Sequence, residues 1–96
     1  MEDIIYYNEL YDLYGDLLTA KQKAYFEDYY FNNLSFSEIA ANYEISRNAA
    51  FKQVHIVIAK LEEYESILKL REKRIKLLDI LKDVPKELKD KIENVI

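Results

Sequence analysis

The chain contains only one glycine and one proline in 96 residues. Because these two residues mark most turns and end most helices, their scarcity predicts long helices joined by short connections. Half of the residues are hydrophobic, which is enough to form a single small core. Apolar residues recur at helical spacing, and no segment alternates between apolar and polar residues as a strand would. The predicted fold class is therefore all-α.

Three local signals predict where helices begin. Thr19 to Gln22 and Ser35 to Glu38 each have the form of a capping box, in which two side chains satisfy free backbone N–H groups reciprocally. Ser46 is a good N-cap for a further helix. These signals and the apolar spacing predict helices over 3–18, 20–31, 36–43 and from 47 onward, and a short final helix after Val84-Pro85 that reaches Ile92.

The helix that begins at Arg47 meets no glycine or proline before Asp83. Ser66 can cap a new helix, which allows a bend near Glu65-Ser66. Residues 57–81 carry a longer apolar stripe than a small helical head can cover, which predicts a homodimer or docking to a partner. The expected organisation is a head over 1–64, with a helix-turn-helix at about 35–64, and a C-terminal extension over 65–96 that mediates dimerisation.

Residues 35–64 have the layout of a helix-turn-helix, in which a short helix and a tight turn hold a second helix at a steep angle. Ala40 lies where the close crossing of the two helices demands a small residue. Glu44 occupies the turn position at which a glycine often supplies a left-handed backbone, which costs another residue ~1 kcal/mol or somewhat more. The shared core is expected to contain Ile39, Tyr43, Ile45, Ala50 and Val54.

The second helix of such a unit places its N-terminal end in the major groove of DNA. The residues expected to face away from its apolar stripe are Arg47, Asn48, Phe51, Lys52 and His55. Arg47 suits a phosphate or guanine, Asn48 suits adenine and Lys52 suits a phosphate. Phe51 suits a thymine methyl group or a partner protein. Ile56 follows where a basic residue would hold the DNA backbone.

Charge is divided unevenly along the chain. Residues 1–46 have two basic and nine acidic residues, a net charge of −7, whereas residues 47–96 have twelve basic and nine acidic residues, a net charge of +3. A basic cluster, in which only Glu72 is acidic, comprises Lys69, Arg71, Lys73, Arg74 and Lys76. One interpretation is a surface that contacts the phosphates of DNA or structured RNA. The other is a solvated helix face on which Glu72 pairs with Lys76.

The order of these motifs resembles the YlxM-like family of low-GC bacteria. The matching segments are Leu17-Leu18-Thr19 with Lys21-Gln22, Tyr29-Tyr30, Leu34-Ser35 with Glu38-Ile39-Ala40, Ser46-Arg47 with Ala49, and Leu61 through Glu65 with Leu68. The resemblance covers about residues 10–80. It implies a helix-turn-helix related to sigma-factor region four, and an association with the signal recognition particle pathway. The chain departs from the family at Ala50-Phe51-Lys52 and at Val54-His55-Ile56-Val57, where two basic residues are lost.

Two function classes follow. In the first, the helix-turn-helix reads DNA and the basic cluster holds the DNA backbone. In the second, the helix-turn-helix is a scaffold, and the chain is an adaptor that contacts the RNA or a protein of the signal recognition particle.

Several other classes are not expected. The chain has no cysteine and one histidine, so no thiolate or histidine metal site is predicted. It has no glycine-rich phosphate loop, and its carboxylates lie beside no candidate nucleophile, so neither an enzyme nor a cofactor is expected. The nine tyrosines have the spacing of core residues. No apolar run approaches the length of a membrane span, and the start lacks the pattern of a signal peptide, so a cytoplasmic protein is expected.

Overall fold

The computed structural model describes residues 3–95 and is helical, with no strand among those residues. Its elements are α1 (Ile4–Tyr14), the 3₁₀ turn η1 (Gly15–Leu17), α2 (Ala20–Phe26), the π-helical turn η2 (Glu27–Phe31), α3 (Phe36–Tyr43), α4 (Arg47–Leu68), α5 (Leu70–Ile80), the 3₁₀ turn η3 (Leu81–Asp83) and α6 (Lys86–Glu93). The molecule is elongated, with extents of 54 × 25 × 24 Å. The all-α prediction is confirmed.

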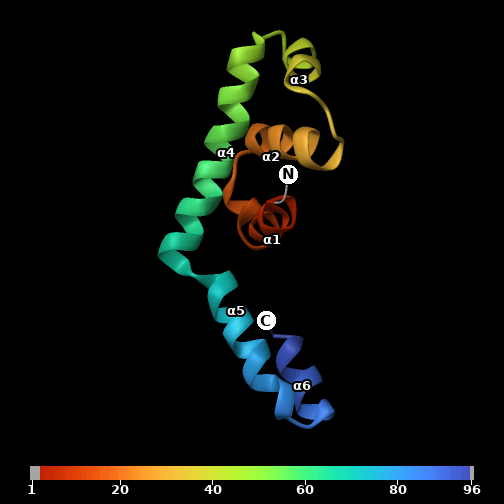
Figure 1. The fold of residues 1–96 in the computed structure, drawn as a ribbon, viewed down its shortest axis with the longest axis vertical. Coiled ribbons are helices and arrows are strands. Elements are labelled where there is room, and N and C mark those ends of the chain that lie inside the picture. Colours follow the sequence, from red (N-terminus) through yellow and green to blue (C-terminus); the bar gives the residue numbers. More distant parts are fainter. Residues whose placement is uncertain (1–2, 96) are drawn as a thin grey trace.

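Helix α4 is the spine of the molecule (Figure 1). Helices α1, α2 and α3 pack against it on one side, with α3 at the end where α4 begins. Helices α5 and α6 form a hairpin beyond the other end of α4. None of the helices described between residues 3 and 95 combines the length and apolar character needed to cross a membrane.

The helix starts predicted from Thr19, Ser35 and Ser46 are confirmed. The Thr19 hydroxyl accepts from the Gln22 N–H (3.1 Å), and the Gln22 side chain accepts from the Thr19 N–H (3.0 Å). Ser35 and Glu38 exchange the same pair of hydrogen bonds at 3.1 and 3.0 Å. The Ser46 hydroxyl accepts from the N–H of the third residue of α4 at 3.0 Å. Each cap stabilises its helix by ~1 kcal/mol.

Two adjoining clusters form the core of the head. One joins α1, α2 and the middle of α4, and comprises Leu10, Tyr14, Leu18, Phe26, Val57 and Leu61. The other joins α2, α3 and the start of α4, and comprises Tyr25, Ile39, Ala40, Ala50 and Val54. Several tyrosines reach carboxylates at the rim of this core. Tyr7 donates to Glu62 at 2.7 Å, and Tyr43 donates to Asp28 at 3.0 Å. The tyrosines therefore combine an apolar ring with a satisfied hydroxyl.

The bend expected near Glu65-Ser66 lies at Lys69, whose backbone is left-handed (φ 54°). Ser66 does not cap α5, because its hydroxyl donates to the Glu63 carbonyl at 2.7 Å. Glu65 takes that role instead. Its carboxylate accepts from the backbone N–H groups of Arg71 (3.0 Å) and Glu72 (3.1 Å) in the first turn of α5.

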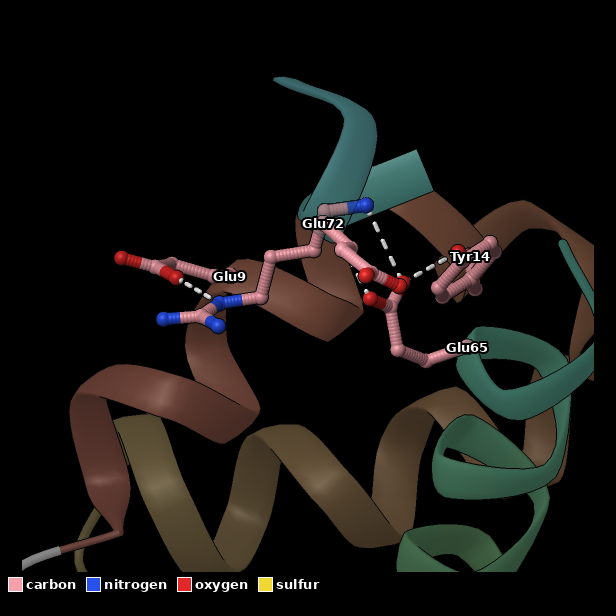
Figure 2. Close-up of polar contacts among 5 residues, drawn as sticks. Glu9, Tyr14, Glu65 and Glu72 are labelled. Atoms are coloured by element: carbon pink, nitrogen blue, oxygen red, sulfur yellow. Dashed lines mark hydrogen bonds and ion pairs between the residues drawn. The ribbon is translucent and has the colours of Figure 1, made fainter. Parts of the chain in front are cut away.

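Tyr14 of α1 completes this junction (Figure 2). Its hydroxyl donates to Glu65 at 2.6 Å and accepts from the Leu70 N–H at 3.0 Å. Burial alone would raise the pKa of Glu65, but the hydrogen bonds from Tyr14 and from the N–H groups of Arg71 and Glu72 outweigh it and hold that pKa below its ordinary value. The carboxylate therefore remains ionised at neutral pH, as the cap requires.

Helices α5 and α6, here called the C-terminal helices, contribute little to the core. No residue of either helix is buried, and Leu81 in η3 is the buried residue of this region. Large apolar side chains that remain exposed here are Leu70, Ile75, Ile80, Leu88 and Val95. The C-terminal helices therefore carry an apolar surface that the described chain leaves uncovered.

Candidate nucleic-acid interface

The corner between α3 and α4 has the geometry of a helix-turn-helix. Glu44 is left-handed (φ 55°, ψ 45°), as predicted for the position that often holds glycine. The Ile45 N–H donates to the Ala40 carbonyl at 3.0 Å, and the Glu44 N–H donates to the Ala41 carbonyl at 3.4 Å. This pair of bonds is the Schellman arrangement that ends a helix and turns the chain. The Ile45 bond has an ordinary length and the Glu44 bond is long, so Glu44 adopts the arrangement with one weakened hydrogen bond.

Small residues let the two helices of the corner approach each other. Ala40 on α3 and Ala50 on α4 are both buried in the second core cluster. Ile39 and Val54 are fully buried beside them, and the five residues expected in the shared core, Ile39, Tyr43, Ile45, Ala50 and Val54, all belong to this cluster or pack against it. The corner is therefore fixed by an apolar core on one face of α4, and the opposite face of the helix is exposed.

All five residues predicted to face away from the core of the corner are exposed. Arg47, Asn48, Phe51, Lys52 and His55 are here called the recognition face. They occupy the first three turns of α4, at one end of the molecule (Figure 1). Because neither α1 nor the C-terminal helices lie at this end, a flat or grooved macromolecule can approach it.

Aromatic rings make up much of the recognition face. Phe51 stacks on His55 with ring centroids 3.9 Å apart, and Phe36 of α3 meets Phe51 edge to face at 5.2 Å. The Arg47 guanidinium lies over the Phe36 ring, 5.8 Å from its centroid. Phe36 is not among the contact residues that the sequence predicts. Its signal was its position directly after the cap Ser35, which places it at the start of α3 beside the turn.

The imidazole of His55 has a defined orientation. Its Nδ1 lies 2.9 Å from the Phe51 carbonyl oxygen, which can only accept a hydrogen bond. Nδ1 therefore carries the proton, and Nε2 is left as the polar atom for a ligand. The predicted surface position of His55 is compatible with this placement, because the residue is exposed.

The charges around the corner nearly balance. Over residues 35–56 the basic residues are Arg47 and Lys52, and the acidic ones are Glu38 and Glu44. Hydrogen bonds from the backbone and hydroxyl of Ser35 hold the pKa of Glu38 below its ordinary value, so this carboxylate stays ionised. A surface with two cations and two anions attracts phosphates weakly. The shape of the corner suits DNA better than its charge does.

The basic cluster lies far from the recognition face. It begins directly after α4, and a helix of 22 residues is about 33 Å long. Two members of the cluster are engaged: Arg71 pairs with Glu9 and lies over the Tyr6 ring at 4.9 Å, and Lys76 pairs with Glu72 at 3.1 Å. The exposed members with no ion pair to a described residue are Lys69, Lys73 and Arg74. The structure does not bring the two predicted contact groups together.

The amino-acid sequence that forms this corner and its core matches a known protein family. A model of the UPF0122 family, described as "Putative helix-turn-helix protein, YlxM / p13 like", matches residues 1–95. The chain belongs to this family. The resemblance seen in the spaced motifs is therefore confirmed. The family is described by its helix-turn-helix and not by a catalytic activity.

Individual relatives are similar over most of their length. A UPF0122 protein of Geobacillus sp. (strain WCH70) is 43% identical over 86 residues, which is 86% of this chain and 78% of the relative. The UPF0122 protein YlxM of Bacillus subtilis (strain 168) is 38% identical over 89 residues, 90% of this chain and 81% of the relative. A UPF0122 protein of Fusobacterium nucleatum is 37% identical over 101 residues, 100% of this chain and 98% of the relative.

The described residues offer no site for a metal ion. Between residues 3 and 95, no three His, Cys, Asp or Glu side chains are grouped closely enough to hold one.

Proposed function

We propose that this chain is a cytoplasmic DNA-binding protein of regulatory or accessory type, and that it inserts the start of α4 into the major groove. The observation that carries the proposal is the recognition face: five exposed side chains on one face of α4, at one end of the molecule, with the opposite face of the helix buried against α2 and α3. This is the placement that a recognition helix requires.

Each side chain of the recognition face has a distinct role in this proposal. Arg47 and Lys52 bind phosphates, or in the case of Arg47 a guanine edge, and Asn48 reads adenine. Phe51 and His55 form a flat surface that contacts thymine methyl groups. Because two cations provide little attraction to phosphates, apolar contact from the aromatic rings supplies a large share of the affinity.

Alanine substitutions test the proposal. Duplexes that bind the purified chain are selected from a random pool, and affinity is measured by fluorescence anisotropy. Arg47→Ala and Lys52→Ala are each expected to weaken binding about fivefold or more, without unfolding the protein. The matched control is Arg74→Ala, which removes an exposed cation far from the corner. If the first two variants bind normally and Lys73→Glu with Arg74→Glu abolishes binding, the recognition-face proposal is wrong.

A second candidate function is an adaptor that contacts the RNA or a protein of the signal recognition particle. The observation that favours it is the position of Lys69, Lys73 and Arg74, which are exposed and lie about 33 Å from the start of α4. A phosphate surface at that distance acts independently of the corner. In that case the same Lys73→Glu and Arg74→Glu pair abolishes binding to the particle's RNA, and Arg47→Ala does not change it.

We also propose that the chain forms a homodimer through the C-terminal extension over 65–96, with residues 1–64 as the head. The support is the uncovered apolar surface of Leu70, Ile75, Ile80 and Leu88. Exposed apolar patches of this kind mark association surfaces. A symmetric dimer presents two recognition faces, which suits paired half-sites on DNA.

A further inference from the structure

A groove rich in tyrosine lies between α1, η2 and α4. Its larger part is a cavity of about 410 Å³ whose lining includes Tyr7, Tyr29, Tyr30, Asp3 and Glu62. The smaller part is a cavity of about 250 Å³ that shares Tyr29 and Tyr30 and reaches Glu38. Because the two cavities share residues, we treat them as one surface and call it the tyrosine groove. His55 lines one edge and is the member of the recognition face that borders it.

The rings of the tyrosine groove meet at steep angles. Tyr7 and Tyr30 have centroids 6.0 Å apart and planes inclined by 52°, and Tyr29 and Tyr30 have centroids 5.0 Å apart and planes inclined by 85°. Tyr29 stacks on Phe36 and Tyr30 stacks on Phe26, each with centroids 4.7 Å apart, so one face of each ring is covered inside the protein. The three tyrosines of the groove leave no parallel pair between which a flat base could stack, whereas a single aromatic face attracts a cation.

Carboxylates are among the residues that line the tyrosine groove. Glu62 accepts a hydrogen bond from the Tyr7 hydroxyl at 2.7 Å, and this bond, with burial, holds the pKa of Tyr7 above its ordinary value. Burial, the neighbouring Tyr29, and the charges of Asp3 and Glu62 raise the pKa of Tyr30 to about 12. The negative charges of Asp3 and Glu62 therefore act on Tyr7 and Tyr30. No Lys or Arg is among the described residues that line either cavity.

We propose that the tyrosine groove binds a segment of a partner protein that carries arginine or lysine, whose cation lies against Tyr7 and Tyr30 and pairs with Glu62. A nucleic acid is disfavoured here, because the carboxylates repel phosphates and no lining cation compensates them. The surrounding chain also favours a basic partner, since residues 1–46 carry a net charge of −7. The inference goes beyond DNA binding, because it gives the head a second ligand on another surface.

The test is a titration of the full chain, ¹⁵N-labelled, followed by NMR. The probe is the peptide acetyl-Gly-Arg-Gly-Arg-Gly-amide, and the comparison peptide carries citrulline, the neutral analogue of arginine, at both arginine positions. The arginine peptide is expected to shift the signals of Tyr7, Tyr29, Tyr30 and Glu62. The citrulline peptide is expected to bind about tenfold more weakly, because it lacks the charge that the rings and carboxylates attract.

Two substitutions with the same change in net charge make the test specific to the groove. Glu62→Gln is expected to weaken binding of the arginine peptide about fivefold or more. Glu63→Gln is the control, because Glu63 is exposed on the same turn of α4 and does not line either cavity. Asp3→Asn is a second groove variant that removes no helix cap, since the Asp3 side chain makes no capping bond.

Four results would overturn the proposal. Equal weakening by Glu62→Gln and Glu63→Gln would show general attraction of a cation to an acidic protein. Equal binding of the arginine and citrulline peptides would show that the charge is not recognised. Shifts of the same tyrosine signals by single-stranded DNA or RNA would make the groove a nucleic-acid site. The same shifts on raising the protein concentration alone would make its occupant a second copy of this chain.

Discussion

The head and the C-terminal helices have similar apolar patterns and different outcomes. In the head, Leu61, Val57 and Phe26 are fully buried between α1, α2 and α4. In the C-terminal helices, Leu70 and Leu77 repeat at helical spacing, yet Leu70 is 42% exposed, and Ile75 and Ile80, five residues apart, are 49% and 67% exposed. Helical periodicity thus predicts which face of a helix is apolar, and does not determine what covers that face. For the head the cover is within the chain, and for the C-terminal helices we propose a second copy.

Truncation of one apolar side chain in each region should show this difference most strongly. Leu61→Ala is expected to lower the free energy of unfolding by about 3 kcal/mol, because Leu61 is fully buried and its loss leaves a cavity. Ile80→Ala is expected to change it by about 0.5 kcal/mol or less at low protein concentration. Urea titrations of both variants check the prediction. Equal losses at low concentration would mean that the C-terminal helices are covered within one chain.

Association provides the next test of the comparison. Sedimentation equilibrium of the wild-type chain should give the mass of a dimer at micromolar concentration. Ile75→Glu with Ile80→Glu is expected to shift it to the monomer, because buried charges oppose association. The control is Ile5→Glu in α1, which places the same charge on a residue of the head that is 69% exposed. A monomeric wild-type chain, or a double variant that still forms the dimer, would contradict dimerisation through these helices.

The junction between the two regions should respond to the loss of one charge. Glu65→Gln is expected to lower the free energy of unfolding by about 1 kcal/mol, a modest amount because the carboxylate is only partly buried. Glu63→Gln makes the same change in charge two residues earlier in α4 and should have little effect. Chemical denaturation at pH 7 measures both, and similar values for the two variants would contradict the role of Glu65 as a cap.

The effect of Glu65→Gln should also depend on pH. The pKa of Glu65 is lower in the folded protein than its ordinary value, so its stabilising contribution is fully present above that ordinary value, about 4.3. The contribution is lost as pH falls through the folded-state pKa. The difference in stability between the wild type and Glu65→Gln should therefore shrink as the pH is lowered below about 4.3. A difference that stays constant down to pH 2 would contradict this linkage.

The turn of the helix-turn-helix should give the smallest effect. Glu44→Gly is expected to raise the free energy of unfolding by about 0.5 kcal/mol, because glycine adopts the left-handed backbone without strain but gains entropy in the unfolded chain. Thermal unfolding of this variant beside Ala41→Gly, which introduces glycine at an exposed position inside α3, checks it. Destabilisation by Glu44→Gly would mean that the Glu44 side chain itself holds the turn.

The head was predictable from sequence because its signals are local. The capping boxes at Thr19 and Ser35 are closed by residues three positions away, and the left-handed turn at Glu44 follows from its distance to Ala40. Ala50 and Val54 follow from helical spacing. Signals between residues a few positions apart are therefore enough to place α2, α3 and the start of α4.

The junction was not predictable, because its partners are distant in sequence. The cap of α5 comes from Glu65 in the preceding helix, and Glu65 is held in turn by Tyr14, 51 residues away. Arg71 was grouped with the basic cluster, yet it pairs with Glu9, 62 residues away. Phe36 contacts Phe51 of the recognition face only because α3 and α4 are folded against each other. No local pattern contains these contacts.

The salt dependence of DNA binding tests the central claim most directly. A selected duplex is titrated with the wild-type chain and with Arg47→Ala plus Lys52→Ala across a series of salt concentrations. If the recognition face binds DNA through its two cations, log Kobs should fall with log salt concentration with a slope of about −2 per protomer, and the double variant should bind weakly with a slope near zero. A slope of about −4 or steeper that the double variant leaves unchanged would contradict the claim and place the contact at the basic cluster.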